Sequence, residues 1–383
     1  MARRPYLTDR HCVSACLSRW QWTISPMSAG RKILIGALLA LLAALAVLAV
    51  TAFLRRDSGY EAWKEAEKTE DADGEAEAYS FVIEAGSKEE TEATAAEEVP
   101  QDNEIVLLFA GDVYLSNHVL AAYDSAGGIN GVLDEAILKE IENADIFMAN
   151  QEFPFTERGM AAADKQFTFR LPMDRVHLMN EMGIDIVTLA NNHILDFGKE
   201  GLLDSCEALD AAGIRYVGAG ADLERARKPE FMEAGGKTIG FLGTSRVYMD
   251  GSWAAGSGHP GVFSTYDSRQ ALESIRAAKE LCDYLVVYVH WGVEKETVPK
   301  EYQRTMGREY IDAGADLVVG SHPHVLQETE YYNGKPIVYS LGNFVFGSSI
   351  PETALLKVVL REDGAQITML PCTSSAGYTR MVQ

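Results

Sequence analysis

Residues 184–198, IDIVTLANNHILDFG, combine an apolar run with a polar cluster at its end. A short apolar run bounded by turn residues is typical of a buried strand. Similar runs predict further strands at 105–110, 145–149, 215–217, 237–243, 284–289 and 317–319. Helical spacing between them predicts helices at 132–141, 175–182, 201–212, 268–281 and 300–313. This alternation predicts an α/β fold.

The end of the chain is expected to form antiparallel pairs. Strand patterns at 327–332 and 336–341 flank Asn333-Gly334, a tight-turn dipeptide. Further patterns at 355–360 and 366–370 flank a second turn signal, Glu-Asp-Gly. We therefore expect one domain over residues 104–383 that grades into hairpins.

The first 103 residues differ in composition from this domain. Residues 33–54 contain no charge, and a helix of that length spans a bilayer core. Basic residues dominate before this segment, so the positive-inside rule predicts a cytoplasmic tail at 1–32 and an extracytoplasmic domain. A cleaved signal peptide is the open alternative, and Met27 could be the natural start. Residues 55–103 are rich in Glu and Ala and predict a disordered acidic linker.

Composition limits the classes of partner and chemistry. The 383-residue chain has a formal net charge of −22 and is 47% hydrophobic. Such acidity repels phosphate backbones, so no nucleic-acid partner is expected. The sequence has neither a phosphate-binding P-loop nor a Gly-x-Ser-x-Gly elbow, so it indicates neither ATP-driven ligation nor serine hydrolase chemistry.

Polar side chains follow nearly every predicted strand, where sites form in open α/β sheets. Singly, each has a plainer interpretation, such as a helix cap or a satisfied core histidine. In an extended backbone, residues two apart point the same way, so the two imidazoles of His-Pro-His can face one ion. Together the acids, amide and imidazoles suit one or two divalent cations, Mn, Fe or Zn. The six candidate ligands are Asp112, Glu152, Asn192, His290, His322 and His324.

Six motif segments follow one another along this domain: GDV (111–113), NQE (150–152), ANNHILDFG (190–198), HWGVE (290–294), GSHPHV (320–325) and SLGNF (340–344). In this order they resemble the CapA/PgsA family of capsule and poly-γ-glutamate biosynthesis proteins, within the calcineurin-like metallophosphatase superfamily. The resemblance covers about residues 104–371 and implies a four-layer α/β/β/α sandwich with a metal site at its strand ends.

The resemblance also implies roles for single residues. His193 matches the general acid, and its spacing from Asp196 suggests that Asp196 orients it. Tyr114 occupies the place of a usual histidine, and the bridging acid is Glu rather than Asp, so a site with one metal stays open. The implied ligands are Asp112 and His324 for a first metal, Asn192, His290 and His322 for a second, and Glu152 between them.

Three further residues are candidate substrate contacts: Arg170, Glu294 and Asn343. Arg170 could bind a phosphate or carboxylate with two hydrogen bonds, although a surface salt bridge explains it equally well. Two functions are expected as alternatives. One is a membrane-anchored, metal-dependent hydrolase acting on a phosphoester or an anionic polymer. The other is a non-catalytic assembly or export subunit of a poly-γ-glutamate synthase complex.

Overall fold

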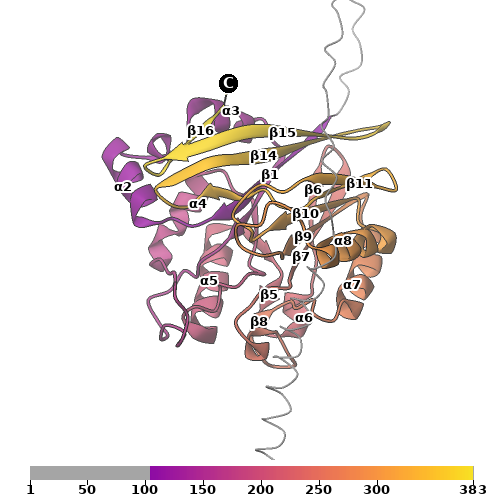
Figure 1. Ribbon diagram of the computed structural model, residues 1–383, viewed down its shortest axis with the longest axis horizontal. Coiled ribbons are helices and arrows are strands. Elements are labelled where there is room, and N and C mark those ends of the chain that lie inside the picture. Colours follow the sequence, from indigo (N-terminus) through magenta and orange to yellow (C-terminus); the bar gives the residue numbers. More distant parts are fainter. Residues whose placement is uncertain (1–103, 383) are drawn as a thin grey trace, which may run out of the picture. The chain divides into compact units, whose positions relative to one another are not determined.

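Two β-sheets lie face to face in the part of the chain that the computed structural model describes, residues 104–382 (Figure 1). The predicted tail, anchor and linker, at 1–32, 33–54 and 55–103, lie outside these residues. Within 104–382, no helix is both long enough and apolar enough to cross a membrane.

The first sheet has eight strands, in the order β16-β15-β14-β1-β2-β3-β4, with β13 also paired to β1. The strands from β1 to β4 are parallel, and those from β14 to β16 are antiparallel. Their bounds are β1 Ile105–Val113, β2 Ile146–Gln151, β3 Ile186–Thr188, β4 Arg215–Val217, β13 Asn343–Val345, β14 Ser349–Arg361, β15 Gly364–Ser375 and β16 Tyr378–Met381.

The second sheet has six strands, in the order β11-β12-β10-β9-β7-β6. Its inner strands are parallel, and its two edge strands are antiparallel to their neighbours. A small separate pair joins β5 (Ala219–Gly220) to β8 (Gly261–Val262). The six bounds are β6 Glu230–Ala234, β7 Lys237–Ser245, β9 Tyr284–His290, β10 Leu317–Ser321, β11 Thr329–Tyr332 and β12 Lys335–Val338.

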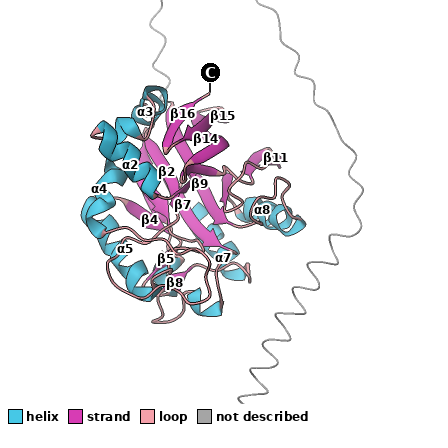
Figure 2. Cartoon of the chain, turned by 60° about the vertical axis from the view of Figure 1, so that its left-hand side comes forward, coloured by secondary structure: helices cyan, strands magenta, loops and turns pink. Residues whose placement is uncertain are grey.

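Helices cover the outer face of each sheet (Figure 2). One apolar core fills the space between the sheets, and two others lie under the two helical layers. The predicted α/β fold is confirmed. The helices are α2 Asn117–Ala126, α3 Glu135–Glu142, α4 His177–Glu181, α5 Gly198–Ala212, α6 Leu223–Ala226, α7 Arg269–Lys279 and α8 Glu301–Ala313, with short 3-10 turns at Ile129–Gly131, Met173–Val176 and Gly251–Trp253.

Several strands run further than their apolar pattern predicts. β1 continues to Val113, β9 to His290 and β10 to Ser321, because each is still paired with a neighbour at that point. Conversely, α3 starts three residues later than predicted, since the Asp134 side chain accepts a hydrogen bond from Ile137 N and caps the helix (2.8 Å). Strand pairing therefore fixes the backbone of the polar residues at the ends of β1, β9 and β10.

Gly111 lies in β1 at the point where this strand packs closely against the backbone of Gly342, just before β13. A Cβ atom placed there would lie 1.9 Å from the carbonyl oxygen of Gly342. We predict that Gly111→Ala lowers the free energy of unfolding by about 3 kcal/mol, the upper range for overpacking. Urea denaturation would measure the loss.

Gly347→Ala is the matched control, because a Cβ at Gly347 would have no atom within 4 Å. Equal urea midpoints for the two variants would contradict the close approach of the two backbones.

Candidate metal centre

The candidate ligands converge because parallel strands end at the same edge. Asp112 of β1 is paired with Asn150 of β2 on one side and with Asn343 of β13 on the other. His290 ends β9 opposite Ser321 of β10. The two sheets therefore bring their strand ends together from opposite sides of the inner core.

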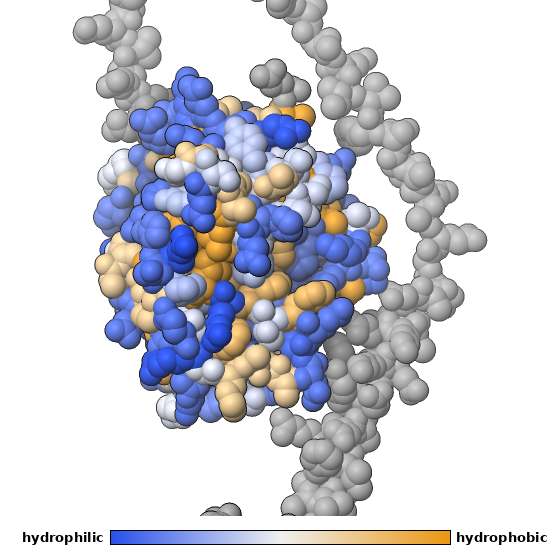
Figure 3. All heavy atoms as spheres, turned by 90° about the vertical axis from the view of Figure 1, so that its left-hand side faces the viewer, coloured by the Kyte–Doolittle hydropathy of each residue, from blue (hydrophilic) through white to orange (hydrophobic). Residues whose placement is uncertain are grey.

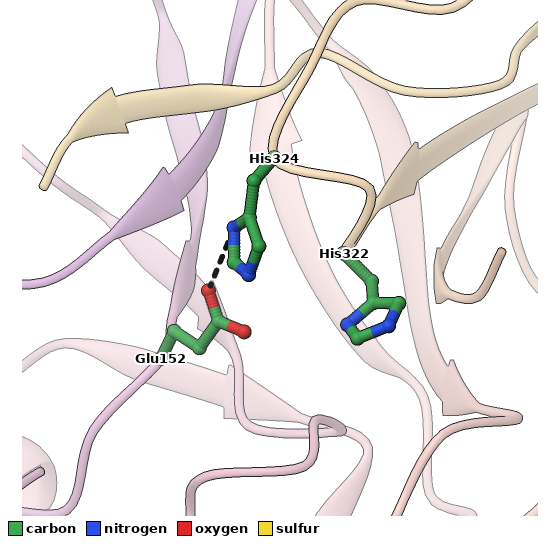
Figure 4. Close-up of side chains that lie close together, drawn as sticks. All are labelled: Glu152, His322 and His324. Atoms are coloured by element: carbon green, nitrogen blue, oxygen red, sulfur yellow. Dashed lines mark ion pairs between the residues drawn. The ribbon is translucent and has the colours of Figure 1, made fainter. Parts of the chain in front are cut away.

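Two sets of side chains could each hold a cation. Glu152, His322 and His324 form one set, and Asp112, Glu152 and His290 form the other. In each set the ligand atoms lie within 4.8 Å of one another. Figure 4 shows Glu152 pointing toward His324, with His322 beside them. Glu152 belongs to both sets, as a bridging position requires, although the histidines divide differently from the implied assignment.

Unpartnered buried atoms show that these residues fit a cation. Both carboxylate oxygens of Glu152 and Nδ1 of His322 are buried without a hydrogen-bond partner. The nearest imidazole nitrogens to Glu152 are Nε2 of His290, at 3.4 Å, and Nδ1 of His324, at 3.8 Å. A buried carboxylate that lacks donors is costly, and metal coordination removes that cost. Imidazole with carboxylate is a ligand set for Zn, Mn or Fe.

Charge is unevenly placed within the cluster. Burial opposes ionisation of Asp112, but its hydrogen bond with His324 and the nearby imidazoles hold its pKa below the usual value. Burial would lower the pKa of His324, yet Glu152 and Asp112 raise it to about 9. Burial and the neighbouring histidines lower the pKa of His322 well below its usual value. His322 is thus a neutral ring, and a cation would take the place of the proton on His324.

Hydrogen bonds orient the ligands. Nδ1 of His290 lies 2.9 Å from the Ser321 hydroxyl, and its Nε2 lies 2.9 Å from Oδ1 of Asn192. The Asn150 amide donates to Asp112 Oδ1 (2.8 Å) and accepts from Asn191 (3.0 Å). Such supporting bonds fix ring orientation around metal ligands. Asn150 and Asn191 were not among the predicted site residues, although both lie in the quoted motifs.

The prediction that the two histidines of His-Pro-His lie in extended backbone is wrong. His322 has φ +99° and His324 has φ +58°, so both lie in the left-handed region after β10 ends. The backbone N–H of His322 donates to Asp112 Oδ2 (3.3 Å), which ties this turn to β1. The two rings still lie close, with centroids 5.8 Å apart. A strained turn, rather than strand alternation, brings them together.

His193 and Asp196 form a second buried pair beside the cluster. Nδ1 of His193 lies 2.7 Å from Asp196 Oδ2, which also accepts from the backbone N–H of Phe169 (2.7 Å). The Phe169 ring stacks on the imidazole, with centroids 4.3 Å apart. The expected contact between the two residues is present, and it fixes the imidazole on two sides.

Lys165 is part of this arrangement, and sequence reasoning missed it. Its ammonium group donates to the Asp196 carboxylate and to the carbonyl oxygen of Asn192, and it lies 3.0 Å from Nδ1 of His193. Burial lowers the pKa of Lys165, against the opposing charges of nearby carboxylates. A single lysine in an irregular loop carries no local signal, so the sequence offered no way to find it.

The three predicted substrate contacts lie in different surroundings. Oδ1 of Asn343 lies 2.7 Å from Nδ1 of His324, so Asn343 joins the cluster directly. Arg170 is exposed and lies over the Phe197 ring, 4.3 Å from its centroid. Glu294 is also exposed, close enough for its charge to act on Lys165. Tyr114, at the position of the usual histidine, stacks on Phe169 with centroids 4.1 Å apart.

A family model described as "Bacterial capsule synthesis protein PGA_cap" matches residues 106–348. The chain belongs to this family. It is 33% identical over 272 residues to the PGA biosynthesis protein CapA of Bacillus subtilis, a match that covers 69% of this chain and 70% of that protein. It is 30% identical over 287 residues to the capsule biosynthesis protein CapA of Bacillus anthracis, over 72% and 69% of the two chains.

Among solved structures, a novel phosphatase from Mycoplasma pneumoniae is similar with a TM-score of 0.46 and 11% identity. That match covers 72% of this chain and 95% of the phosphatase. At this TM-score the likeness decides nothing about fold or activity.

Proposed function

We propose that this capsule-synthesis family member is a metal-dependent hydrolase of capsule or poly-γ-glutamate biosynthesis, which cleaves a phosphoester or an amide. One observation carries the proposal. The buried, unpartnered carboxylate of Glu152 lies among imidazoles, next to the hydrogen-bonded pair of His193 and Asp196. Perturbed and unsatisfied groups of this kind cluster at functional sites.

In this hydrolase, the groups of the site would have separate roles. A divalent ion held by the candidate ligands would polarise the substrate oxygen and supply an activated water. His193 would protonate the leaving oxygen or nitrogen from Nε2, because Asp196 holds Nδ1. Lys165 would keep the Asp196 carboxylate in place by its ammonium group. Ser321 would orient His290 through the bond to its Nδ1, so Nε2, which lies beside Glu152 and Asn192, would be left for the ion.

The alternative is a non-catalytic subunit of a synthase or export complex. The family description favours it, because that description names synthesis rather than breakdown of a capsule. In this case the metal centre would organise the domain or bind polymer, and His193 would be dispensable.

The proposed location is the outer face of the cell membrane, with residues 33–54 as a single-pass anchor and the N-terminus in the cytoplasm. The support is the uncharged run and the basic residues before it. An extracytoplasmic site would act on polymer as it leaves the cell.

The test uses the full-length protein in mild detergent with Mn²⁺, Fe²⁺ or Zn²⁺. We expect turnover of bis(4-nitrophenyl) phosphate or of γ-glutamyl 4-nitroanilide, abolished by a chelator and restored by the metal. Bound metal without turnover of either compound would contradict the hydrolase and favour the subunit.

A further inference from the structure

A pocket of about 370 Å³ adjoins the metal centre. His324 and Asn343 line it on the side of the cluster, and Lys295, Thr297 and the start of β14 line it elsewhere. This volume lies in the range of small-molecule sites. Anything bound to the cluster beside His324 would therefore have room to extend into this space.

The side of the pocket that Lys295 forms is hydrogen-bonded to the turn that carries His322 and His324. The backbone N–H of Lys295 donates to the carbonyl oxygen of Pro323 (2.8 Å), between the two histidines of the turn. Lys295 itself has φ +68°, a conformation that needs such support. A backbone hydrogen bond therefore links this wall of the pocket to the turn that carries the two candidate ligands.

Two opposite charges line the pocket. Lys295 and Glu352 are both exposed, and neither has an ion-pair partner within residues 104–382. Val325 and Pro351 add apolar surface, and Thr297 adds a hydroxyl. The lining contains no Phe, Tyr or Trp ring on which a base or sugar would stack, and its one imidazole belongs to the candidate metal cluster. A plain phosphate would suit Lys295 but would be repelled by Glu352.

We propose that this pocket binds an amino-acid moiety that carries both a free carboxylate and a free ammonium group. Lys295 would pair with the carboxylate and Glu352 with the ammonium. Val325 and Pro351 would contact the aliphatic stem. A glutamyl chain end has this chemistry. The inference rests on the proposed function in one respect: the metal centre would act on the bond that this moiety presents to it.

Binding of free glutamate, as both enantiomers, would be measured by calorimetry on the full-length protein in detergent, with glutarate as the analogue that lacks the ammonium. We expect Glu352→Gln to weaken glutamate binding about tenfold, which is about 1.4 kcal/mol, and to spare glutarate, because only glutamate carries the ammonium group that Glu352 would bind. Lys295→Met should weaken both ligands. Glu362→Gln, an exposed acid in the turn after β14, is the matched control and should change neither.

Absence of saturable glutamate binding to the wild-type protein would overturn the proposal. So would equal effects of Glu352→Gln on glutamate and glutarate. Hydrolysis of bis(4-nitrophenyl) phosphate, which has no amino-acid group, separates this failure from failure of the proposed function. Turnover without glutamate binding removes the pocket assignment alone, and the predicted binding pattern without turnover removes the hydrolase alone.

Discussion

Replacing His322 and His324 together by alanine is expected to remove nearly all bound divalent metal from the protein. The two imidazoles belong to one compact ligand set with Glu152, whose buried oxygens have no other partner. Loss of mere supporting residues costs metal sites 10–100-fold in affinity, so loss of two ligands should cost more than about 100-fold. Elemental analysis after dialysis would measure it, against about one or two equivalents in the wild type.

His259→Ala is the matched control, because His259 is an exposed histidine on another loop. It should retain full metal content. Full metal retention by the double variant, with an unchanged circular dichroism spectrum, would show that the cluster is not a metal site.

The second large effect is expected at His193. His193→Ala should lower kcat by about 10²–10⁴-fold while metal content stays at the wild-type level, because the proposed role is proton transfer. Asp196→Asn should also lower kcat, since an amide cannot hold Nδ1–H as the carboxylate does. Steady-state kinetics on the phosphodiester, with parallel metal analysis, separates this loss from loss of the ion.

Asp164→Asn provides a neighbouring acid-to-amide control. Asp164 is exposed and has φ +60°, which asparagine tolerates, so its kcat should match the wild type. A His193→Ala variant with unchanged kcat would leave the non-catalytic subunit as the better account.

Local sequence patterns predicted most of the strands and helices of the domain. Apolar runs of three to seven residues indicated the parallel strands, because a strand buried on both faces has little room for polar side chains. The Asn333-Gly334 turn appears where expected, with φ +51° and +77° between β11 and β12. By contrast, β6, β13 and β16 were missed, since their patterns are short or mixed and pairing with distant strands stabilises them.

The sequence by itself determined which residues could form a metal site. Residues of metal-binding types follow the predicted strands, in the same order as the motifs of the family. Only the tertiary structure decided how they meet. Pairing of β13 with β1 brings Asn343 beside Asp112, a left-handed turn orients His322 and His324, and a loop lysine reaches Asp196. The strand pairing and the lysine contact join segments far apart in the chain, and the turn is held by the bond from the His322 N–H to Asp112. Their energies depend on the packing of the whole domain, which no local pattern encodes.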